Sequence, residues 1–122
     1  MTLSVLVADD SALARKLLIH ALPEDWDVEV SEAKNGAEAL DAYHAGRASV
    51  MFLDLTMPVM TGFEVLDKLH RLDANVVVIV VSADVQVGAR DRVKAAGALA
   101  FVAKPVSREK LEPILREYGL YA

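Results

Sequence analysis

The sequence predicts an α/β fold in which a doubly wound, five-stranded parallel sheet is covered by five helices. Five short apolar runs alternate along the 122 residues with segments of helical periodicity. The run from Val76 to Val81 contains only β-branched residues, which is typical of a strand covered by helices on both faces. Parallel neighbours need crossover connections, and the helices between the strands supply them. A chain of this length is sufficient for one domain with its own core.

Composition and charge exclude several functional classes. Eighteen acidic and 13 basic side chains give a net charge of −5, which disfavours direct binding to nucleic acid. The absence of cysteine excludes disulfides, zinc–thiolate sites and thiol nucleophiles, and fits a cytoplasmic protein. Residues 1–5 show no charged leader or cleavage site, and no apolar run approaches the ~20 residues that cross a bilayer, so we expect no membrane association.

The first strand, the first helix and an edge strand are predicted from residues 3–32. Leu3 to Ala8 is an apolar run that ends in two aspartates, and a helix follows until Pro23 stops it. The apolar positions of this helix are Leu13, Leu17, Leu18, Ala21 and Leu22. Between Trp26 and Glu32 apolar and charged residues alternate, which favours a half-exposed edge strand.

The middle of the chain is predicted to form a helix, the central strand and a further helix. Asn35 suits an N-cap because a glutamate follows three residues later, and Gly46 closes this helix. Ser49 to Leu53 is the central strand, and it delivers Asp54 to its carboxyl end. The segment Thr61-Gly62-Phe63-Glu64 has the spacing of a capping box, so a third helix is expected to run to about residue 72.

The C-terminal third is predicted to contain two strand–helix units. The strand from Val76 to Val81 ends at Ser82, and residues 86–96 form a weakly amphipathic helix. Val87 and Val93 are expected to face the core from this helix. Its outward residues are Arg90, Arg92 and Lys94.

The last unit comprises a short strand over residues 99–102 and a final helix. The strand ends just before Lys104, and Ser107 caps the helix. Pro113 lies inside the helix and removes one backbone donor, so we expect a kink or a late start there.

Polar side chains are expected to gather at one edge of the sheet, because parallel strands direct their carboxyl ends to the same side. The groups at these ends are Asp9, Asp10, Asp54, Ser82 and Lys104. Carboxylates about 4–6 Å apart repel by roughly 4 kcal/mol per pair at an effective dielectric constant of about 20, so a cation is needed among them. Lys104 neutralises one charge, and Mg²⁺ suits the remaining oxygen ligands. These groups describe a pocket for a phosphoryl group, with Asp54 as the in-line nucleophile.

Each of these residues also has an ordinary structural interpretation when it is taken alone. An Asp-Asp-Ser segment before a helix is commonly an N-cap, Asp54 could form a turn, Ser82 could cap locally, and Lys104 could be a surface charge. Phe101 would ordinarily be a core residue. The coincidence at four strand ends favours the chemical interpretation. The histidines have no matching partners in the sequence; they are His20, His44 and His70.

On these motifs the chain resembles the receiver domain of response regulators, in its single-domain, CheY-like form. The matching segments are Val7-Ala8-Asp9-Asp10-Ser11, Asn35-Gly36-Ala37-Glu38-Ala39-Leu40, Leu53-Asp54-Leu55-Thr56-Met57-Pro58 with Gly62, Ser82-Ala83 and Lys104-Pro105. The resemblance runs from end to end. It implies a flavodoxin/CheY-like fold with strand order 2-1-3-4-5, and one receiver domain over residues 1–122 without an output domain.

The resemblance implies a role in two-component signalling. Asp54 would accept a phosphoryl group from the phosphohistidine of a sensor histidine kinase or a phosphotransfer protein. Asp10, Asp54 and the Thr56 backbone carbonyl would bind Mg²⁺, with Asp9 assisting through water. We therefore expect a phosphorylatable switch and not an enzyme.

The resemblance also implies how the phosphoryl group is sensed. Lys104 would contact its oxygens, Ser82 would move in to hydrogen-bond one of them, and Phe101 would follow inward. Phe101 replaces the commoner tyrosine, so a switch that depends on a ring hydroxyl is excluded, although packing in or out remains possible. The peptide bond between Lys104 and Pro105 is expected to be cis.

An unidentified output protein is expected to bind the face made by helix 86–96, strand 99–102 and the last helix. Pro113 perturbs that last helix and so affects this surface. Asp84 and Thr56 occupy positions at which the family tunes the lifetime of the phosphoryl group. The chain is expected to be a monomer or a weak dimer.

Three alternatives remain. A phosphoryl sink would drain a kinase without driving a partner. A pseudo-receiver would use the fold only for binding, although the intact site argues against it; its residues are Asp10, Asp54, Ser82 and Lys104. A phosphohydrolase of the haloacid dehalogenase type is suggested by a nucleophilic aspartate, but that family needs its nucleophile on the first strand and an acidic residue where this chain has Thr56.

Overall fold

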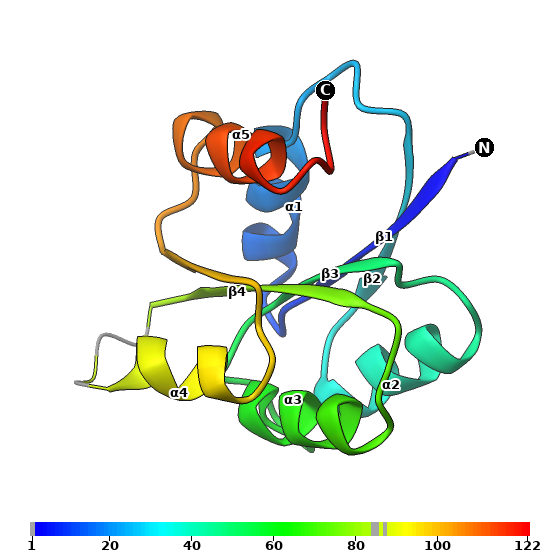
Figure 1. The fold of residues 1–122 in the computed structure, drawn as a ribbon, viewed down its shortest axis with the longest axis vertical. Helices are drawn as coiled ribbons and strands as arrows, with labels where there is room; N and C mark the ends of the chain where they lie inside the picture. Colours follow the sequence, from blue (N-terminus) through cyan, green and yellow to red (C-terminus); the bar gives the residue numbers. More distant parts are fainter. Residues whose placement is uncertain (1, 84–85, 87) are drawn as a thin grey trace.

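The computed structural model describes residues 2–83, 86 and 88–122, and these form one five-stranded parallel sheet with helices on both faces (Figure 1). The strands are β1 (Leu3–Ala8), β2 (Val28–Ala33), β3 (Val50–Leu53), β4 (Val77–Ser82) and β5 (Ala100–Ala103). The helices are α1 (Ala12–Ala21), α2 (Gly36–His44), α3 (Gly62–Arg71), α4 (Ala89–Ala95) and α5 (Arg108–Glu117). The strand order is β2-β1-β3-β4-β5, so the predicted fold class and order are confirmed.

Two hydrophobic clusters lie on opposite faces of the sheet. Figure 1 shows α1 and α5 on one face and α2, α3 and α4 on the other. Successive residues of a strand point to opposite faces, so Val5 and Val7 belong to the first cluster and Leu6 and Ala8 to the second. This explains why the inner strands are apolar without alternation, and why they can carry charged groups only at their ends.

Hydroxyl and amide side chains start four of the helices. The caps and the backbone N–H groups that donate to them are Ser11 and Ala14, Asn35 and Glu38, Thr61 and Glu64, and Ser107 and Lys110. The capping box of Thr61 and Glu64 is complete, as predicted. The Glu38 carboxylate instead accepts from the N–H of Lys34, one residue before the expected donor.

Two elements begin two or more residues later than predicted. Strand β2 begins at Val28, so Trp26 lies outside it; the indole N–H donates to the Leu120 carbonyl at 2.8 Å. Helix α4 is shorter than residues 86–96, because Gly88, at φ 88°, stands as its N-cap. Val93 is fully buried, as expected. The predictions for Val87 and Asp84 fall outside the described residues.

Two further expectations about the helices are corrected. Helix α5 begins at Arg108 and continues through Pro113, so the late start is wrong. Among the predicted apolar positions of α1, Leu18 is 5% exposed, whereas Leu13 and Leu17 are 66% and 55% exposed. Two leucines of α1 therefore face solvent.

Candidate functional site

Strand pairing brings the predicted polar groups to one rim of the sheet. Ala8 of β1 lies opposite Leu53 of β3, and the N–H of Asp54 donates to the Ala8 carbonyl at 3.0 Å. On the other side, the N–H of Lys104 donates to the carbonyl of Ser82 at 3.0 Å. Asp9, Asp54 and Lys104 thus follow directly after their strands, Asp10 comes one residue later, and Ser82 is the last residue of β4.

Three carboxylates form the centre of this rim. Asp9, Asp10 and Asp54 each offer an oxygen atom, and these atoms all lie within 4.8 Å of one another. Asp9 and Asp54 are buried, each 6% exposed, whereas Asp10 is exposed. Residues from two separate strand ends therefore build one acidic cluster.

Lys104 is the cation that the structure places against this cluster. Its Nζ lies 2.7 Å from Asp9 Oδ2 and 3.6 Å from Asp54 Oδ2. Burial alone would lower the pKa of Lys104, but the hydrogen bond to Asp9 and the charge of Asp54 outweigh it and raise the pKa. Lys104 stays charged and offsets one of the three negative charges.

Asp54 is the carboxyl that this environment disfavours in its charged form. Burial raises its pKa, and the neighbouring Asp9 raises it further. Lys104 and hydrogen bonds from the backbone at Thr56 and Leu55 act in the opposite direction but do not cancel the first two effects. A cation bound beside the Asp54 carboxylate would therefore stabilise the folded chain.

The raised pKa of Asp54 predicts a pH-dependent stability difference between the wild type and Asp54→Asn. Between the ordinary value of 3.8 and the raised pKa, the folded chain holds the Asp54 proton more tightly than the unfolded chain, so this group lowers stability as pH rises through that window. Without added metal, Asp54→Asn should have the higher free energy of unfolding at neutral pH. The difference should shrink below pH 3.8. Urea denaturation across this range measures it, and a wild type that is the more stable protein at neutral pH would contradict the assignment.

Comparison with known proteins identifies the family. Residues 5–116 match the model of the response regulator receiver domain. The chain belongs to this family. As a receiver domain, it is a component of two-component signalling, and the resemblance seen in its motifs is confirmed.

The relatives include longer proteins and single receivers. The receiver is 45% identical over 107 residues to a protein-glutamate methylesterase/protein-glutamine glutaminase of Geobacillus kaustophilus (strain HTA426), covering 85% of this chain and 30% of that protein. It is 31% identical over 107 residues to chemotaxis protein CheY of Bacillus subtilis (strain 168), covering 88% of this chain and 89% of that one. The chain thus spans less than a third of its methylesterase relatives.

A solved structure of a complex contains a chain with the same fold. The receiver superposes on a chain of the CheX-CheY-BeF3-Mg+2 complex from Borrelia burgdorferi with a TM-score of 0.85, at 28% identity and over 96% of this chain and 89% of that chain. That complex contains a partner protein, beryllium fluoride and magnesium.

The donor set of this receiver fits a magnesium ion. Three carboxylates within 4.8 Å are hard oxygen ligands, and two of their charges remain after Lys104 has offset one. Burial of Asp54 and, to a lesser extent, the charge of Asp9 raise the pKa of Asp54. A divalent cation would neutralise the two remaining charges.

The two residues predicted to respond to the phosphoryl group lie on the neighbouring strands β4 and β5. Ser82 ends β4 and is 1% exposed. Phe101 of β5 is 8% exposed; the Arg90 guanidinium lies 4.6 Å from its ring centroid and donates to its carbonyl at 3.3 Å. Thr56 is exposed two residues after Asp54, and the bond between Lys104 and Pro105 is cis, as expected.

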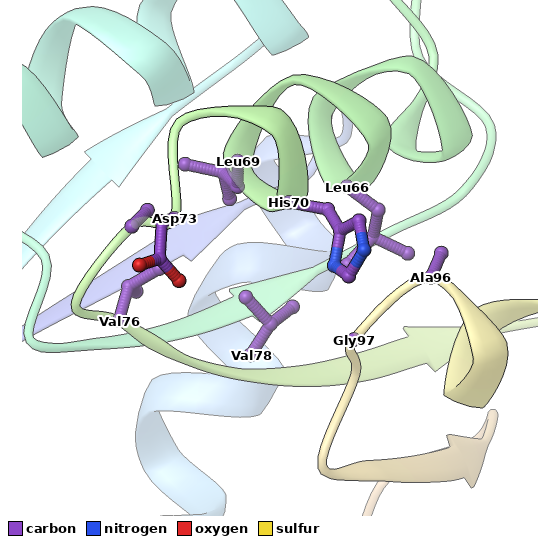
Figure 2. Close-up of a pocket in the computed structure, with 9 residues that line it drawn as sticks. Leu66, Leu69, His70, Asp73, Val76, Val78, Ala96 and Gly97 are labelled. Carbon is purple, nitrogen blue, oxygen red and sulfur yellow. The ribbon is translucent and has the colours of Figure 1, made fainter.

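A small cavity at the opposite end of β4 is separate from this rim. Figure 2 shows His70 of α3 beside Ala96 and Gly97, above Val78 of β4; Val76, which directly precedes that strand, also lines the cavity. The cavity measures about 90 Å³. His70, like His20 and His44, lies in the last turn of its helix, where basic residues interact favourably with the helix dipole. These histidines take no part in the acidic cluster.

Two polar contacts at the rim were missed by sequence reasoning. The Ser11 N–H donates to Asp9 Oδ1 at 2.9 Å, and Arg15 donates to the Asp9 carbonyl at 2.7 Å. The only sequence signal for the second contact is an arginine one helical turn after the Ser11 cap.

Proposed function

We propose that this receiver is a phosphorylatable switch in which Asp54 accepts a phosphoryl group from the phosphohistidine of a sensor histidine kinase or a phosphotransfer protein. The observation that carries the proposal is the convergence of Asp9, Asp10 and Asp54 within 4.8 Å, with Lys104 reaching both Asp9 and Asp54. The groups that would serve as nucleophile, cation and metal ligands for one phosphoryl group thus lie together.

The reaction follows from these positions. A carboxylate oxygen of Asp54 attacks phosphorus in line with the bond to the histidine nitrogen; that bond breaks, its electron pair returns to the imidazole, and an acyl phosphate forms. Lys104 offsets charge on the phosphoryl oxygens. Mg²⁺, held by Asp10, Asp54 and the Thr56 carbonyl with Asp9 assisting, would supply the further positive charge that these oxygens need. In dephosphorylation, a water oxygen attacks phosphorus, the bond to the Asp54 oxygen breaks and its electron pair returns to the carboxylate, and inorganic phosphate leaves.

The switch would be read through residues beyond the site. Ser82 would hydrogen-bond a phosphoryl oxygen, and Phe101 would repack in response. An unidentified output protein would bind the face of α4, β5 and α5. We propose a cytoplasmic, monomeric or weakly dimeric receiver that is a switch and not an enzyme. Within the described residues, no helix is both long and apolar enough to span a bilayer.

Of the alternatives, a phosphoryl sink uses the same acceptor chemistry and differs only because it regulates no output protein. A pseudo-receiver does not need the acidic cluster and lysine together, and both are present. Membership of the receiver family removes the support for a haloacid dehalogenase-type hydrolase.

The phosphodonor is proposed to dock beside the acidic rim. A cavity of about 460 Å³ is lined by Leu17 and Leu18 of α1, by Pro105 and Val106, and by Asp9 and Lys104. Because the last two also belong to the acidic rim, an apolar partner surface in this groove would bring its histidine to Asp54. The exposed leucines of α1 suit such a contact.

Leu17→Glu is expected to slow phosphotransfer from a histidine kinase by about tenfold or more, since it places a charge in an apolar contact. Labelling by acetyl phosphate should slow far less, because that donor needs no protein contact. The matched control is Leu72→Glu, which changes a leucine that is 53% exposed beyond α3. Transfer from an autophosphorylated kinase core, followed as radiolabel, measures both. Equal slowing with the two donors would argue against docking here, and a wild type that accepts from acetyl phosphate but from no kinase would argue against the proposed donor.

A further inference from the structure

Arg15 connects the acidic rim to the edge strand of the sheet. Its Nη1 donates to the main-chain carbonyl of Asp9 at 2.7 Å, and its Nε lies 2.9 Å from Glu32 Oε1 on β2. The Arg15 side chain is only 16% exposed. By contrast, the Arg71–Asp67 pair on α3 is 76% and 59% exposed, and such surface pairs contribute little. Arg15 is therefore held in one geometry by two partners.

Local structure explains why Arg15 reaches back to Asp9. Ser11 caps α1, and the Arg15 N–H donates to the Ser11 carbonyl at 3.0 Å, so Arg15 lies one turn into the helix. Long side chains on a helix lean toward its N-terminus. The guanidinium group thus returns over the turn that contains the two aspartates.

All four polar groups of Asp9 have a protein partner. Its N–H donates to the Ala33 carbonyl at 3.0 Å, Oδ1 accepts from Ser11 at 2.9 Å, and Oδ2 accepts from Lys104 at 2.7 Å. The carbonyl accepts from Arg15. This last bond holds the peptide that joins Asp9 to Asp10, so it influences both carboxylates at once.

We propose that Arg15 is a positioning residue for the acidic site. By fixing the Asp9–Asp10 peptide, it sets the direction of the buried Asp9 carboxylate and of the exposed Asp10 carboxylate, so that both meet Asp54 within 4.8 Å. Glu32 holds the guanidinium in place for this contact. The inference rests on the proposed Mg²⁺-dependent function and deepens it.

Positioning and simple charge predict opposite effects on metal binding. Arg15 is a cation near three carboxylates, so the loss of its charge alone would tighten the binding of Mg²⁺. The loss of a contact that orients metal ligands weakens binding instead, by about tenfold at the lower end of the usual range. The sign of the change therefore separates the two roles.

The test is a calorimetric titration with MgCl2 of the wild type, Arg15→Ala, Arg15→Lys and the control Arg71→Ala. Arg15→Ala should bind Mg²⁺ about tenfold more weakly. Arg15→Lys keeps a hydrogen-bond donor and the positive charge but not the planar guanidinium group, so it should recover part of the lost Mg²⁺ affinity. Arg71→Ala should match the wild type. In metal-free protein, Arg15→Ala should also exchange the Ser11 amide hydrogen faster, while the Val80 amide in the buried strand β4 stays protected and shows that the fold is intact.

Unchanged or tighter Mg²⁺ binding by Arg15→Ala would overturn the inference and leave Asp54 as the acceptor. A wild type that binds no Mg²⁺ would overturn the proposed function instead. In that event, hydrogen exchange still tests whether Arg15 positions Asp9. Faster exchange of the Ser11 amide in Arg15→Ala, with Val80 still protected, would support this role. Unchanged exchange of the Ser11 amide would rule it out.

Discussion

Asp54→Asn is expected to take up no phosphoryl group from acetyl phosphate in the presence of Mg²⁺. The asparagine amide has almost the shape of the carboxylate, but it lacks the charge and the nucleophilic oxygen that form an acyl phosphate. The phosphorylated fraction should fall to the background seen without acetyl phosphate. Intact-mass spectrometry measures the phosphorylated fraction directly.

The control for this result is Asp41→Asn, which removes an exposed carboxylate from α2, away from the acidic cluster. It should be labelled at the wild-type rate. If Asp54→Asn were labelled as fast as Asp41→Asn, the acceptor would be another residue and the proposed chemistry would be wrong.

Gly62→Ala is expected to have the second largest effect, because Gly62 is pressed against the loop that carries Asp54. A Cβ atom at this position would lie 2.2 Å from the Asp54 carbonyl oxygen and 2.7 Å from the Leu55 Cα, and both are backbone atoms that cannot rotate away. The Gly62 N–H also donates to the Leu55 carbonyl at 3.0 Å. The added methyl group must therefore displace Asp54 or the start of α3.

We expect Gly62→Ala to lower the free energy of unfolding by about 1–3 kcal/mol, the usual cost of overpacking. Acetyl phosphate labelling should slow by up to about 100-fold, since a shift of about 1 Å at a reacting group has that effect. Gly46→Ala is the control: its φ of 77° strains an alanine, but no atom lies within 4 Å. It should lose about 1 kcal/mol of stability and keep its labelling rate. Equal labelling by the two variants would show that Gly62 does not position Asp54.

The acidic rim could be predicted because its signal is local. Each strand is an apolar run, and the first polar residue after it marks the carboxyl end, as at Asp54 after Leu53 and Lys104 after β5. Parallel strands then bring these ends together without any knowledge of side-chain contacts. The roles of the individual residues at the site remain predictions that the experiments above address.

The contacts that were missed or wrong depend on distant partners. Helical spacing finds the leucines of α1 but does not show that Leu18 is buried while Leu17 is exposed, because that depends on how the helix lies on the sheet. Trp26 fits an alternating strand, yet its indole is held by Leu120, 94 residues away. The bond from Arg15 ends on a main-chain carbonyl, which no residue type reveals.

The outward arginines of α4 show a related limit of periodicity. Arg90 and Arg92 are exposed, as expected, yet the guanidinium group of each also contacts an aromatic ring. The Arg90 guanidinium lies over Phe101, and that of Arg92 lies 3.8 Å from the ring centroid of Phe63 on α3. A long side chain can leave the outer face of a helix and cover apolar surface beside it, so the position of its Cα alone does not place its charge.

The most direct test of the proposed phosphoryl site is a crystal structure of this chain with Mg²⁺ and beryllium fluoride. We expect beryllium on an Asp54 carboxylate oxygen, Mg²⁺ at about 2.0–2.1 Å from oxygens of Asp10, Asp54 and the Thr56 carbonyl, and fluorines in contact with Lys104 and Ser82. Beryllium on another side chain, or a magnesium ion bound away from these carboxylates, would contradict the account.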